Sequence, residues 1–194
     1  MRKIEITIIL ALVVVIGGFL YWWNKDNTVS LNEDGQTTLS ATQIASIKAI
    51  GTWEFLSVSD EELVDTVRKG FFGDDELIRI YYGTLRIGID MGETAEDWIK
   101  TENDSLVCIL PPVKLLDHNF IDEARTKSFY ESGKWTGQDR QDLYQRAYNA
   151  MTARCLTDTQ LDIARRNART QFGNLFRTMG FNKVKIMIEG EKEE

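Results

Sequence analysis

The sequence predicts an α+β protein, in which an N-terminal transmembrane helix precedes a mixed or antiparallel sheet of about four to five strands packed by long C-terminal helices. Three observations lead to this class. An apolar run fills the first two dozen residues, polar and apolar side chains alternate over residues 84–90, and apolar side chains recur every three or four residues between 137 and 179.

The first segment, residues 1–23, is predicted to be an uncleaved membrane anchor. Residues 6–23 contain no proline, charge or amide, and a helix over residues 4–23 is about 30 Å long, the thickness of a hydrocarbon core. The alternative is a cleaved signal peptide, which has a shorter apolar core that ends in small residues. This run ends in bulky aromatic residues, which favours an anchor that contacts the lipid bilayer through residues 4–23.

The residues that flank the anchor predict its orientation. Arg2 and Lys3, with the amino terminus, outweigh the single Lys25 on the far side, and positive charge is retained in the cytoplasm. The aromatic end of the anchor, where rings prefer lipid headgroups, is formed by Tyr21, Trp22 and Trp23. We therefore expect a single-pass protein of the inner (cytoplasmic) membrane, with its N-terminus in the cytoplasm and its C-terminal domain outside it.

The remainder of the chain divides by composition. Residues 24–38 are polar and lack helical periodicity, so they are interpreted as a linker with a mean span of about 20–25 Å. Residues 39–189 have the size of one domain with its own core, and we expect a single α+β domain there. Residues 190–194 form an acidic tail.

Charge is divided unevenly along the chain. Residues 24–104 carry 7 basic and 17 acidic side chains, a net charge of −10, whereas residues 105–188 carry 13 basic and 8 acidic ones, a net charge of +5. Either the two halves complement each other within the fold, or neighbouring copies associate through acidic and basic faces. The sequence pI of about 4.9 and the interleaved acids argue against a nucleic-acid partner.

The domain is predicted to begin with a helix, a strand and a second helix. Ser40 caps a helix that reaches residue 50, and residues 52–58 are aromatic and β-branched, as in a strand. Ser59, followed by three acids, resembles the start of a helix that ends at Gly70. The apolar face of this second helix would be formed by Leu63, Val64 and Val67.

The clearest strand follows a turn at residues 71–75. Residues 77–90 contain a strict alternation of apolar and polar side chains towards their end, and Gly83 indicates a bend or bulge. Arg86 and Asp90 lie on the polar face of this strand, where solvated strand residues are the ordinary interpretation and a binding pair is the alternative.

A second strand is predicted at residues 105–110. Two prolines end it, and residues 113–116 resume strand structure at a sheet edge. Residues 120–132 are interpreted as a helix, and a long helical region from 137 to 179 contains a second capping pattern that predicts a break near residues 156–158.

The end of the domain is predicted to return to the sheet. Gly180 followed by Phe181 has the pattern of a helix terminator with an apolar contact. Residues 184–188 alternate in polarity, and a strand that follows two helices is expected to join the sheet formed earlier.

No catalytic, cofactor-binding or metal-binding residues are predicted. His118, the single histidine, lies beside a proline pair and is interpreted as a loop residue or one at the start of a helix. Residues 74–76 are acidic but do not have calcium-loop spacing. Cys108 and Cys155 are interpreted as small buried hydrophobes, and a disulfide between them is the alternative.

The C-terminal helices are basic. Asp162 is placed to pair with an arginine three or four residues later, which is typical of a solvated helix face. The alternative is a docking surface for an acidic partner or for anionic lipid headgroups. The arginines concerned are Arg154, Arg165, Arg166, Arg169 and Arg177.

Three segments, IYYGTLRIGIDM, SLVCILPPVKLLD and NARTQFGNLFRTMGFNKVKI, occur in that order along the chain. Together they resemble the bacterial family called domain of unknown function 4230, over about residues 39–188. Gly83 to Asp90 is similar to the family's G-x-x-x-x-G-I-D segment. The resemblance implies an N-terminal anchor, a strand that ends at proline, long helices and a short last strand, and it implies no activity.

Function is therefore predicted from layout alone. The leading hypothesis is a non-enzymatic scaffold or adaptor of the cell envelope that forms a homo-oligomer or binds an envelope protein. It rests on the anchor, the short linker and the divided charge, with no catalytic pattern and no cofactor predicted. The alternatives are a membrane-tethered hydrolase of envelope polymers and a sensor of a small ligand.

Overall fold

The computed structural model describes residues 38–102 and 105–191. The chain divides into two units, Met1–Thr37 and Thr38–Glu194, and the second contains all of the described residues. The predicted anchor and its flanking residues Arg2, Lys3, Tyr21, Trp22 and Trp23 lie outside them, as does most of the linker. Among the helices of the described ranges, none has the length and apolarity needed to span a bilayer.

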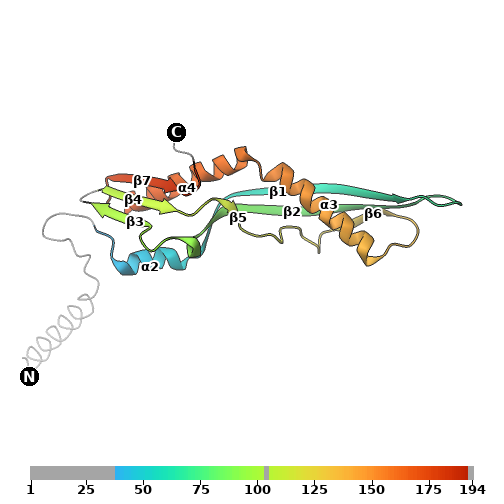
Figure 1. Cartoon of the computed structure of the whole chain (residues 1–194), viewed down its shortest axis with the longest axis horizontal. Coiled ribbons are helices and arrows are strands. Elements are labelled where there is room, and N and C mark those ends of the chain that lie inside the picture. The colour runs from blue at the N-terminus through green and yellow to red at the C-terminus, as the bar shows by residue number, and fades with distance from the viewer. Residues whose placement is uncertain (1–37, 103–104, 192–194) are drawn as a thin grey trace, which may run out of the picture. The chain divides into compact units, whose positions relative to one another are not determined.

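A long antiparallel hairpin runs through the described unit (Figure 1). Its strands are β1 (Thr52–Arg68) and β2 (Asp75–Asp90), which pair along their whole lengths. A strand of 17 residues is about 55 Å long. The strand predicted at residues 77–90 and the turn before it are confirmed.

The helix predicted between Ser59 and Gly70 is wrong, because β1 continues through that stretch. Val64 is buried while Leu63 and Asp65 on either side are exposed, which is the period of a strand. Two of the acids that suggested a helix cap, Asp60 and Glu62, bind Arg154 instead. Pairing with β2 outweighs the local capping pattern because strand formation depends on neighbours that are distant in sequence.

The strands form two sheets and not the single sheet that the sequence predicts. In one sheet the order is β1-β2-β5, and β6 also pairs with β2; in the other the order is β3-β4-β7. Only the β4–β7 pair is parallel among the strand pairs of the described residues. The remaining strands are β3 (Ile99–Glu102), β4 (Ser105–Leu110), β5 (Lys114–Leu115), β6 (Lys127–Glu131) and β7 (Lys183–Ile188).

Three of these strands confirm sequence predictions. β4 has the predicted bounds, β5 resumes strand structure after the prolines at one end of the strand order, and β7 returns to pair with β4. β3 was not predicted. Its four residues are too few to show a clear alternation of polarity.

The helix predicted at residues 120–132 is also wrong. This stretch runs along β2, where Ile121 bridges Gly83 and β6 pairs with residues 77–80. Five of its residues form β6, and all five are exposed. A short exposed strand contributes little apolar periodicity, so the sequence could not distinguish it from a polar helix.

Gly83 has a different role from the predicted bulge. The register shift in β1 lies between Glu54 and Leu56, far from Gly83. A Cβ atom at Gly83 would lie 2.9 Å from the Met151 side chain and 3.2 Å from the Phe120 carbonyl oxygen. Glycine is therefore used there because a helix and a loop approach the strand closely.

The helices of the described residues begin and end largely as predicted. They are α2 (Ala41–Ala49), α3 (Gly137–Cys155) and α4 (Asp158–Thr178), with a short 3₁₀ helix η1 (Met91–Glu93). Ser40 and Gln43 form a capping box at the start of α2. Thr157 caps α4 and confirms the break between the long helices. The Phe181 amide donates to the Phe176 carbonyl at 3.2 Å, as in a helix terminator of the predicted kind.

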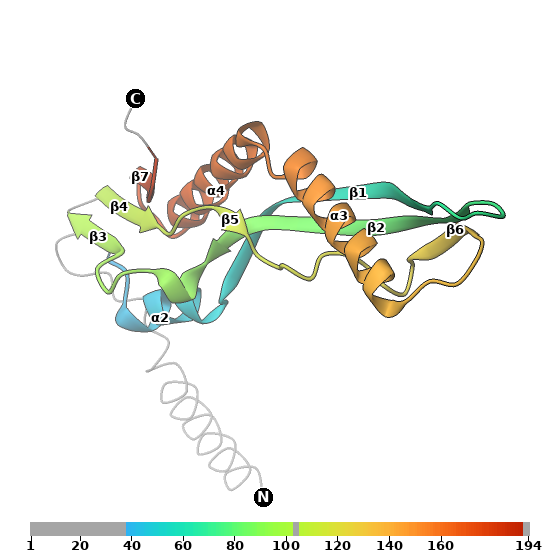
Figure 2. The same cartoon turned by 45° about the vertical axis from the view of Figure 1, so that its right-hand side comes forward.

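The described unit has two parts, an arm and a base (Figure 2). The arm comprises residues 59–85 of the hairpin, β6 and α3. The base comprises the hairpin residues 52–58 and 86–90 with α2, η1, β3, β4, β5, β7 and α4. The β1–β2 turn lies at the end of the arm that is remote from the base, as both views show.

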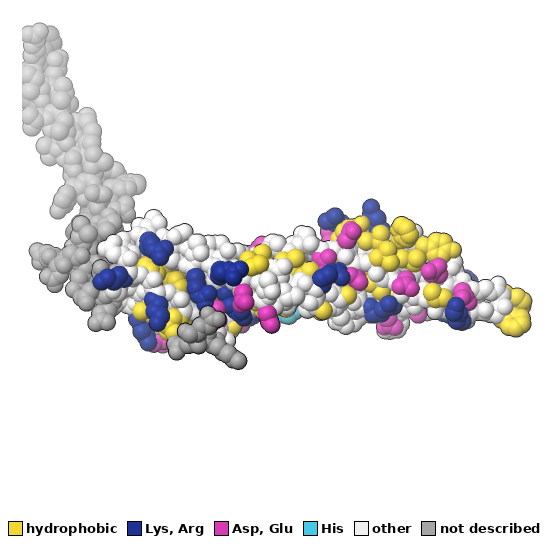
Figure 3. Space-filling model, turned by 90° about the horizontal axis from the view of Figure 1, so that it is seen from above, with side chains coloured by type: hydrophobic (Ala, Val, Ile, Leu, Met, Phe, Trp, Pro, Cys, Tyr) yellow, Lys and Arg dark blue, Asp and Glu magenta, His cyan; other side chains and the backbone are white. Residues whose placement is uncertain are grey.

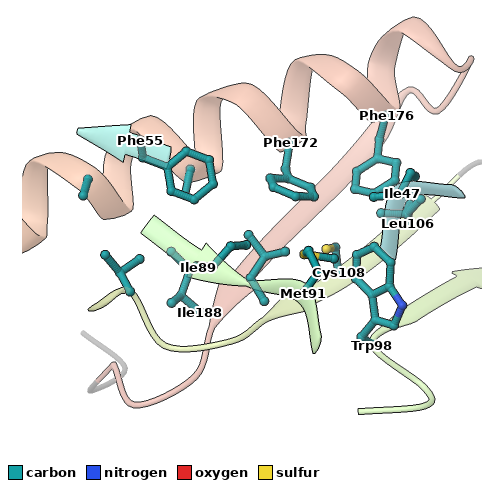
Figure 4. Packing of buried hydrophobic residues seen from close by; sticks show 14 of the residues in the cluster. Ile47, Phe55, Ile89, Met91, Trp98, Leu106, Cys108, Phe172, Phe176 and Ile188 are labelled. Carbon is teal, nitrogen blue, oxygen red and sulfur yellow. The ribbon is translucent and has the colours of Figure 1, made fainter. Parts of the chain in front are cut away.

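Each part has its own hydrophobic core. In the base, Phe172 and Phe176 point from α4 toward Cys108 and Leu106 of the three-stranded sheet (Figure 4). In the arm, α3 packs on one face of the hairpin, where Leu143, Ala147 and Met151 meet the side chains of Leu77, Tyr81 and Leu85. The base therefore packs both α4 and the second sheet against the hairpin's inner end, whereas a single helix covers the hairpin in the arm.

Candidate docking surface

The tip of the hairpin presents two fully exposed aromatic rings. Phe71 and Phe72 are 95% and 100% exposed, and their rings meet edge to face with centroids 5.1 Å apart. Lys69 closes the turn through a salt bridge of 2.5 Å to Asp74. Gly73 has a φ angle of +136°, which favours glycine. The turn is thus held by its own contacts, and the two phenylalanines contribute nothing to a core.

A face of the arm is also apolar and open. β1 and β2 alternate, so the residues on the face opposite α3 are Glu61, Leu63, Asp65 and Val67 of β1 and Glu76, Ile78, Ile80 and Tyr82 of β2. β6 adds Lys127 and Tyr130, which pair with Ile80 and Ile78. Arg125 lies 4.8 Å above the ring of Tyr82 and completes this set, which is called the open face.

The open face is exposed to solvent in the described part of the chain. Leu63, Val67 and Tyr130 are 54%, 43% and 50% exposed, whereas Val64, which points toward α3, is 4% exposed. Figure 3 shows hydrophobic side chains gathered over the outer part of the arm and at its end. Contiguous apolar surface of this kind marks interaction sites in soluble domains.

Charge is arranged on the two sides of the open face. Glu61 and Asp65 lie on β1, at one side, and neither side chain is occupied by a salt bridge in the described residues. Arg125 and Lys127 lie at the other side, beyond β2. An apolar stripe thus runs between an acidic border and a basic border, and Glu76 of β2 lies at the end of the stripe nearest the turn.

The backbone edge of β1 is partly occupied by side chains. Arg154 and Arg146 of α3 donate to the carbonyl oxygens of Glu61 and Asp65 at 3.3 and 2.7 Å, and Asn167 of α4 donates to that of Phe55 at 2.9 Å. An edge strand with free carbonyl groups invites another strand to pair with it. These donors occupy three carbonyl groups along the edge and obstruct such pairing, which favours the open face and the tip as the surface for a partner.

Arg154 also joins the two charged halves of the sequence within one chain. Its guanidinium binds Asp60 at 2.7 Å and Glu62 at 2.6 Å. Burial tends to raise the pKa of Asp60, but hydrogen bonds from Arg154 and from the Cys155 thiol outweigh it and hold that pKa below its usual value of 3.8. This supports the interpretation that the acidic and basic halves complement each other in the fold.

The pKa values of four other carboxyl groups are also lowered. A hydrogen bond from Arg140 lowers the pKa of Glu131, and Lys69 and Lys100 do the same for Asp74 and Asp97. The backbone amide of Thr136 lowers the pKa of Asp139. A hydrolase of glycosidic polymers needs a carboxylic acid of raised pKa, and these groups have the opposite shift.

The predicted basic helix face forms a groove between α4 and β7. The groove has a volume of about 820 Å³ and is bordered by Arg165, Arg166, Arg169 and Lys185. Asp162 pairs with Arg165 at 2.5 Å, as predicted, and Glu191 binds Arg169. Two acids therefore neutralise part of the positive charge, and the groove is a weaker candidate for a ligand than the arm is for a partner.

The remaining sequence candidates have structural roles. His118 is an exposed loop residue whose Nδ1 lies 3.4 Å from the Tyr148 hydroxyl oxygen. Arg86 pairs with Glu54 at 2.5 Å, and Asp90 caps η1 through the Gly92 amide. No group of three or more metal-ligating side chains occurs among the residues that the structure describes.

Both cysteines are free and buried, as expected of small hydrophobes. Burial raises the pKa of Cys108 to about 12. Burial and a hydrogen bond to Asp60 raise the pKa of Cys155 to about 11. Both thiols are therefore protonated at neutral pH and are poor nucleophiles.

The residues of the docking surface were missed by sequence reasoning. Leu63 and Val67 are four apart, which was interpreted as the buried stripe of a helix, and residues 71–75 were treated as a simple turn. One signal was present in the sequence. Two adjacent phenylalanines between glycines, as in GFFG, place large apolar rings in a turn that cannot bury them.

A family model described as Protein of unknown function (DUF4230) matches residues 45–186. The matched range begins within α2 and ends within β7, so it contains most of the base, the arm and the whole docking surface. No curated protein and no solved structure matches the chain.

Proposed function

The chain belongs to the family described as Protein of unknown function (DUF4230), and we propose that it is a membrane-anchored, non-enzymatic scaffold or adaptor of the cell envelope. In this proposal residues 1–23 anchor it in the inner membrane, with Arg2 and Lys3 on the cytoplasmic side and Tyr21, Trp22 and Trp23 at the outer interface. The linker holds the base outside the membrane, and the arm docks a partner.

The observation that carries the proposal is the apolar arm. A hairpin about 55 Å long is stabilised by α3 on one face only, and it leaves Phe71, Phe72 and the open face in solvent. Exposed aromatic side chains at the centre of a patch are typical anchors of protein–protein interfaces. Exposed apolar side chains lower the solubility of a free domain. A docking role explains why this arm has them.

A protein surface fits the tip better than a lipid surface does. The tip residues 67–76 carry two basic and three acidic side chains, so their net charge is −1. Their two basic side chains are already paired, Arg68 with Asp139 at 3.1 Å and Lys69 with Asp74. Anionic headgroups attract clusters of unpaired basic residues, which the tip does not have.

The test is site-specific photo-crosslinking of the full-length chain in intact cells. A photoreactive residue is placed at Phe72 or at Leu63, and the matched control position is the exposed Glu96 in the base. We expect adducts to one recurring envelope protein, or to the chain itself, from both arm positions and not from position 96. An abundant chain that gives no protein adduct, or that gives only lipid adducts, would overturn the proposal.

The α4–β7 groove is the observation that favours the ligand-sensor alternative. Arg166 and Lys185 border it without a salt bridge to a described acid, so an anionic ligand has cations to bind there. A sensor of this kind would raise its melting temperature in the presence of inorganic phosphate or a polyphosphate. An Arg166→Ala variant would abolish that increase, whereas the scaffold proposal requires no such increase.

A further inference from the structure

We propose that the open face is covered by a second copy of this chain. The two copies pack face to face about a two-fold axis that runs parallel to β2. This inference rests on the docking role proposed above and names the partner of the open face. Three features support it: the apolar stripe, the charge at its two borders, and the side chains bound to the edge of β1.

The apolar stripe is centred on β2. Ile78, Ile80 and Tyr82 lie in the middle strand, with Leu63 on one side and Tyr130 on the other. Two antiparallel sheets pack through such faces at a separation of about 10 Å. A second stripe of the same kind would bury these side chains, as α3 buries the apolar residues on the opposite face of the hairpin.

The strand register fixes which charged residues lie level with which apolar ones. Leu63, Ile80 and Lys127 form one cross-strand row. Glu61 and Asp65 lie two residues before and after Leu63 on β1, on the same face. On each copy the basic border is therefore level with the gap between the two acids.

This pattern selects one arrangement of the two copies. A two-fold axis parallel to the strands exchanges the borders, so Lys127 of one copy faces Leu63 of the other, between Glu61 and Asp65. An axis perpendicular to the strands would place the acidic border against itself. Opposite charges at the rim fix the register and suppress the wrong one.

The same arrangement is compatible with a shared membrane. Because the two hairpins run in the same direction, both copies have their α2 helices at the same end. Two chains whose anchors enter one bilayer meet at a raised effective concentration, so an interface of modest area is sufficient. The side chains bound to the β1 edge obstruct strand-to-strand pairing and favour this face as the route of association.

The experiment is a charge inversion with the purified full-length chain in detergent micelles, measured by light scattering and by co-purification of two tags. Variant A carries Glu61→Lys and Asp65→Lys, and variant B carries Arg125→Glu and Lys127→Glu. We expect the wild-type chain to be dimeric and each variant to self-associate at least about tenfold more weakly. Because each border then faces its opposite, a mixture of A and B is expected to form a heterodimer.

A control variant and a geometric test complete the experiment. Glu96→Lys places the same kind of charge change on the base and should leave the dimer unchanged. Because β2 lies along the axis, Ile80→Cys should give a disulfide-linked dimer under mild oxidation, whereas Leu63→Cys should not link to itself. A monomeric wild-type chain, or variants A and B that associate as well as the wild type, would overturn the inference.

The two proposals fail in different ways. Photo-crosslinks from positions 63 and 72 to another envelope protein, with a monomeric purified chain, would overturn the second-copy inference and leave the scaffold proposal intact. The absence of protein adducts from both positions would overturn the scaffold proposal itself.

Discussion

The two ends of one hairpin differ in the side chains that they leave uncovered. In the base, Ile87 and Ile89 of β2 are fully buried because α4 and the second sheet enclose the strand. In the arm, Ile78 and Ile80 of the same strand face away from α3 and remain partly exposed. Ile87 and Ile89 lie on the face of β2 that the helices cover, whereas the opposite face carries Arg86 in the base and Ile78 and Ile80 in the arm. The difference therefore lies in the sequence of the uncovered face, which is polar in the base and apolar in the arm.

This difference separates residues that hold the fold together from residues that the fold does not need. Burial of a large side chain in the base stabilises the folded state by about 1.5–3 kcal/mol, whereas an exposed apolar side chain in the arm contributes nothing comparable. An apolar residue on an uncovered face therefore indicates an interaction. Substitutions in the two regions test whether the buried residues of the base stabilise the fold and the exposed apolar residues of the arm do not.

The largest expected effect is in the base. Phe172 is fully buried, and its ring lies 4.8 Å from that of Trp53, so Phe172→Ala is expected to lower the free energy of unfolding by about 3–5 kcal/mol. Phe72→Ala is the matched substitution in the arm and should change it by less than about 0.5 kcal/mol. Urea denaturation measures the free energy of unfolding of both variants. A large loss of stability from Phe72→Ala would contradict the difference between the arm and the base.

A smaller effect is expected where α3 meets the arm. Gly83→Ala places a methyl group 2.9 Å from Met151 and 3.2 Å from the Phe120 carbonyl, which should cost about 1–3 kcal/mol of stability through overpacking. Gly137→Ala is the control, because a Cβ atom there meets nothing within 4 Å. Thermal unfolding should separate the two variants; equal melting temperatures would show that α3 does not hold the arm closely.

Arg154→Ala should have a still smaller and pH-dependent effect. Its salt bridges to Asp60 and Glu62 are partly exposed, so the loss is expected to be about 1 kcal/mol or less at pH 7. The pKa of Asp60 in the folded state lies below its usual value of 3.8, so its stabilising contribution is present above that pH. As the pH falls through the lowered pKa, Asp60 becomes protonated and the contribution is lost.

The measurement is the difference in unfolding free energy between the wild type and Arg154→Ala as a function of pH. That difference should shrink below pH 3.8, whereas the exposed Arg166→Ala control should give no comparable difference at any pH. A wild-type advantage that grew at acidic pH would contradict the assignment of Asp60 as the partner.

The smallest effect is expected from thiol reagents. Cys108 in the base and Cys155 in the arm are both buried, with pKa values raised to about 12 and about 11. We expect a maleimide to label neither thiol within minutes at pH 7 in the folded chain, and to label both in guanidinium chloride. Single Cys→Ser variants identify the site if labelling occurs, and fast labelling of Cys155 would indicate that the end of α3 opens.

Elements with local signals were predictable from the sequence. Ser40, Thr157 and Gly180 contribute caps or terminators that depend only on residues within one helical turn, and the long helices begin and end where these residues place them. The strand at 77–90 was recognised because its alternation extends over many residues. β6 was missed because it is short, exposed and paired with a strand about fifty residues away.

The docking surface could not be predicted because its residues share no local pattern. Leu63 and Val67 fit one face of a helix as well as one face of a strand, so the local spacing favoured the wrong structure. Lys127 joins them only through the pairing of β6 with β2. The glycines on either side of Phe71 and Phe72 indicate that these rings are exposed in a turn. The sequence did not show that the turn lies at the end of a long arm.

The sequence by itself determined the family, the α+β class, the long helices with their break, and the strands whose alternation is long enough to read. Only the tertiary structure decided that β1 is one continuous strand, that the strands divide between two sheets, and that one face of the arm is uncovered. The reason is physical. Helix caps and terminators act between residues a few positions apart, whereas strand pairing and burial depend on partners that the chain brings together only when it folds.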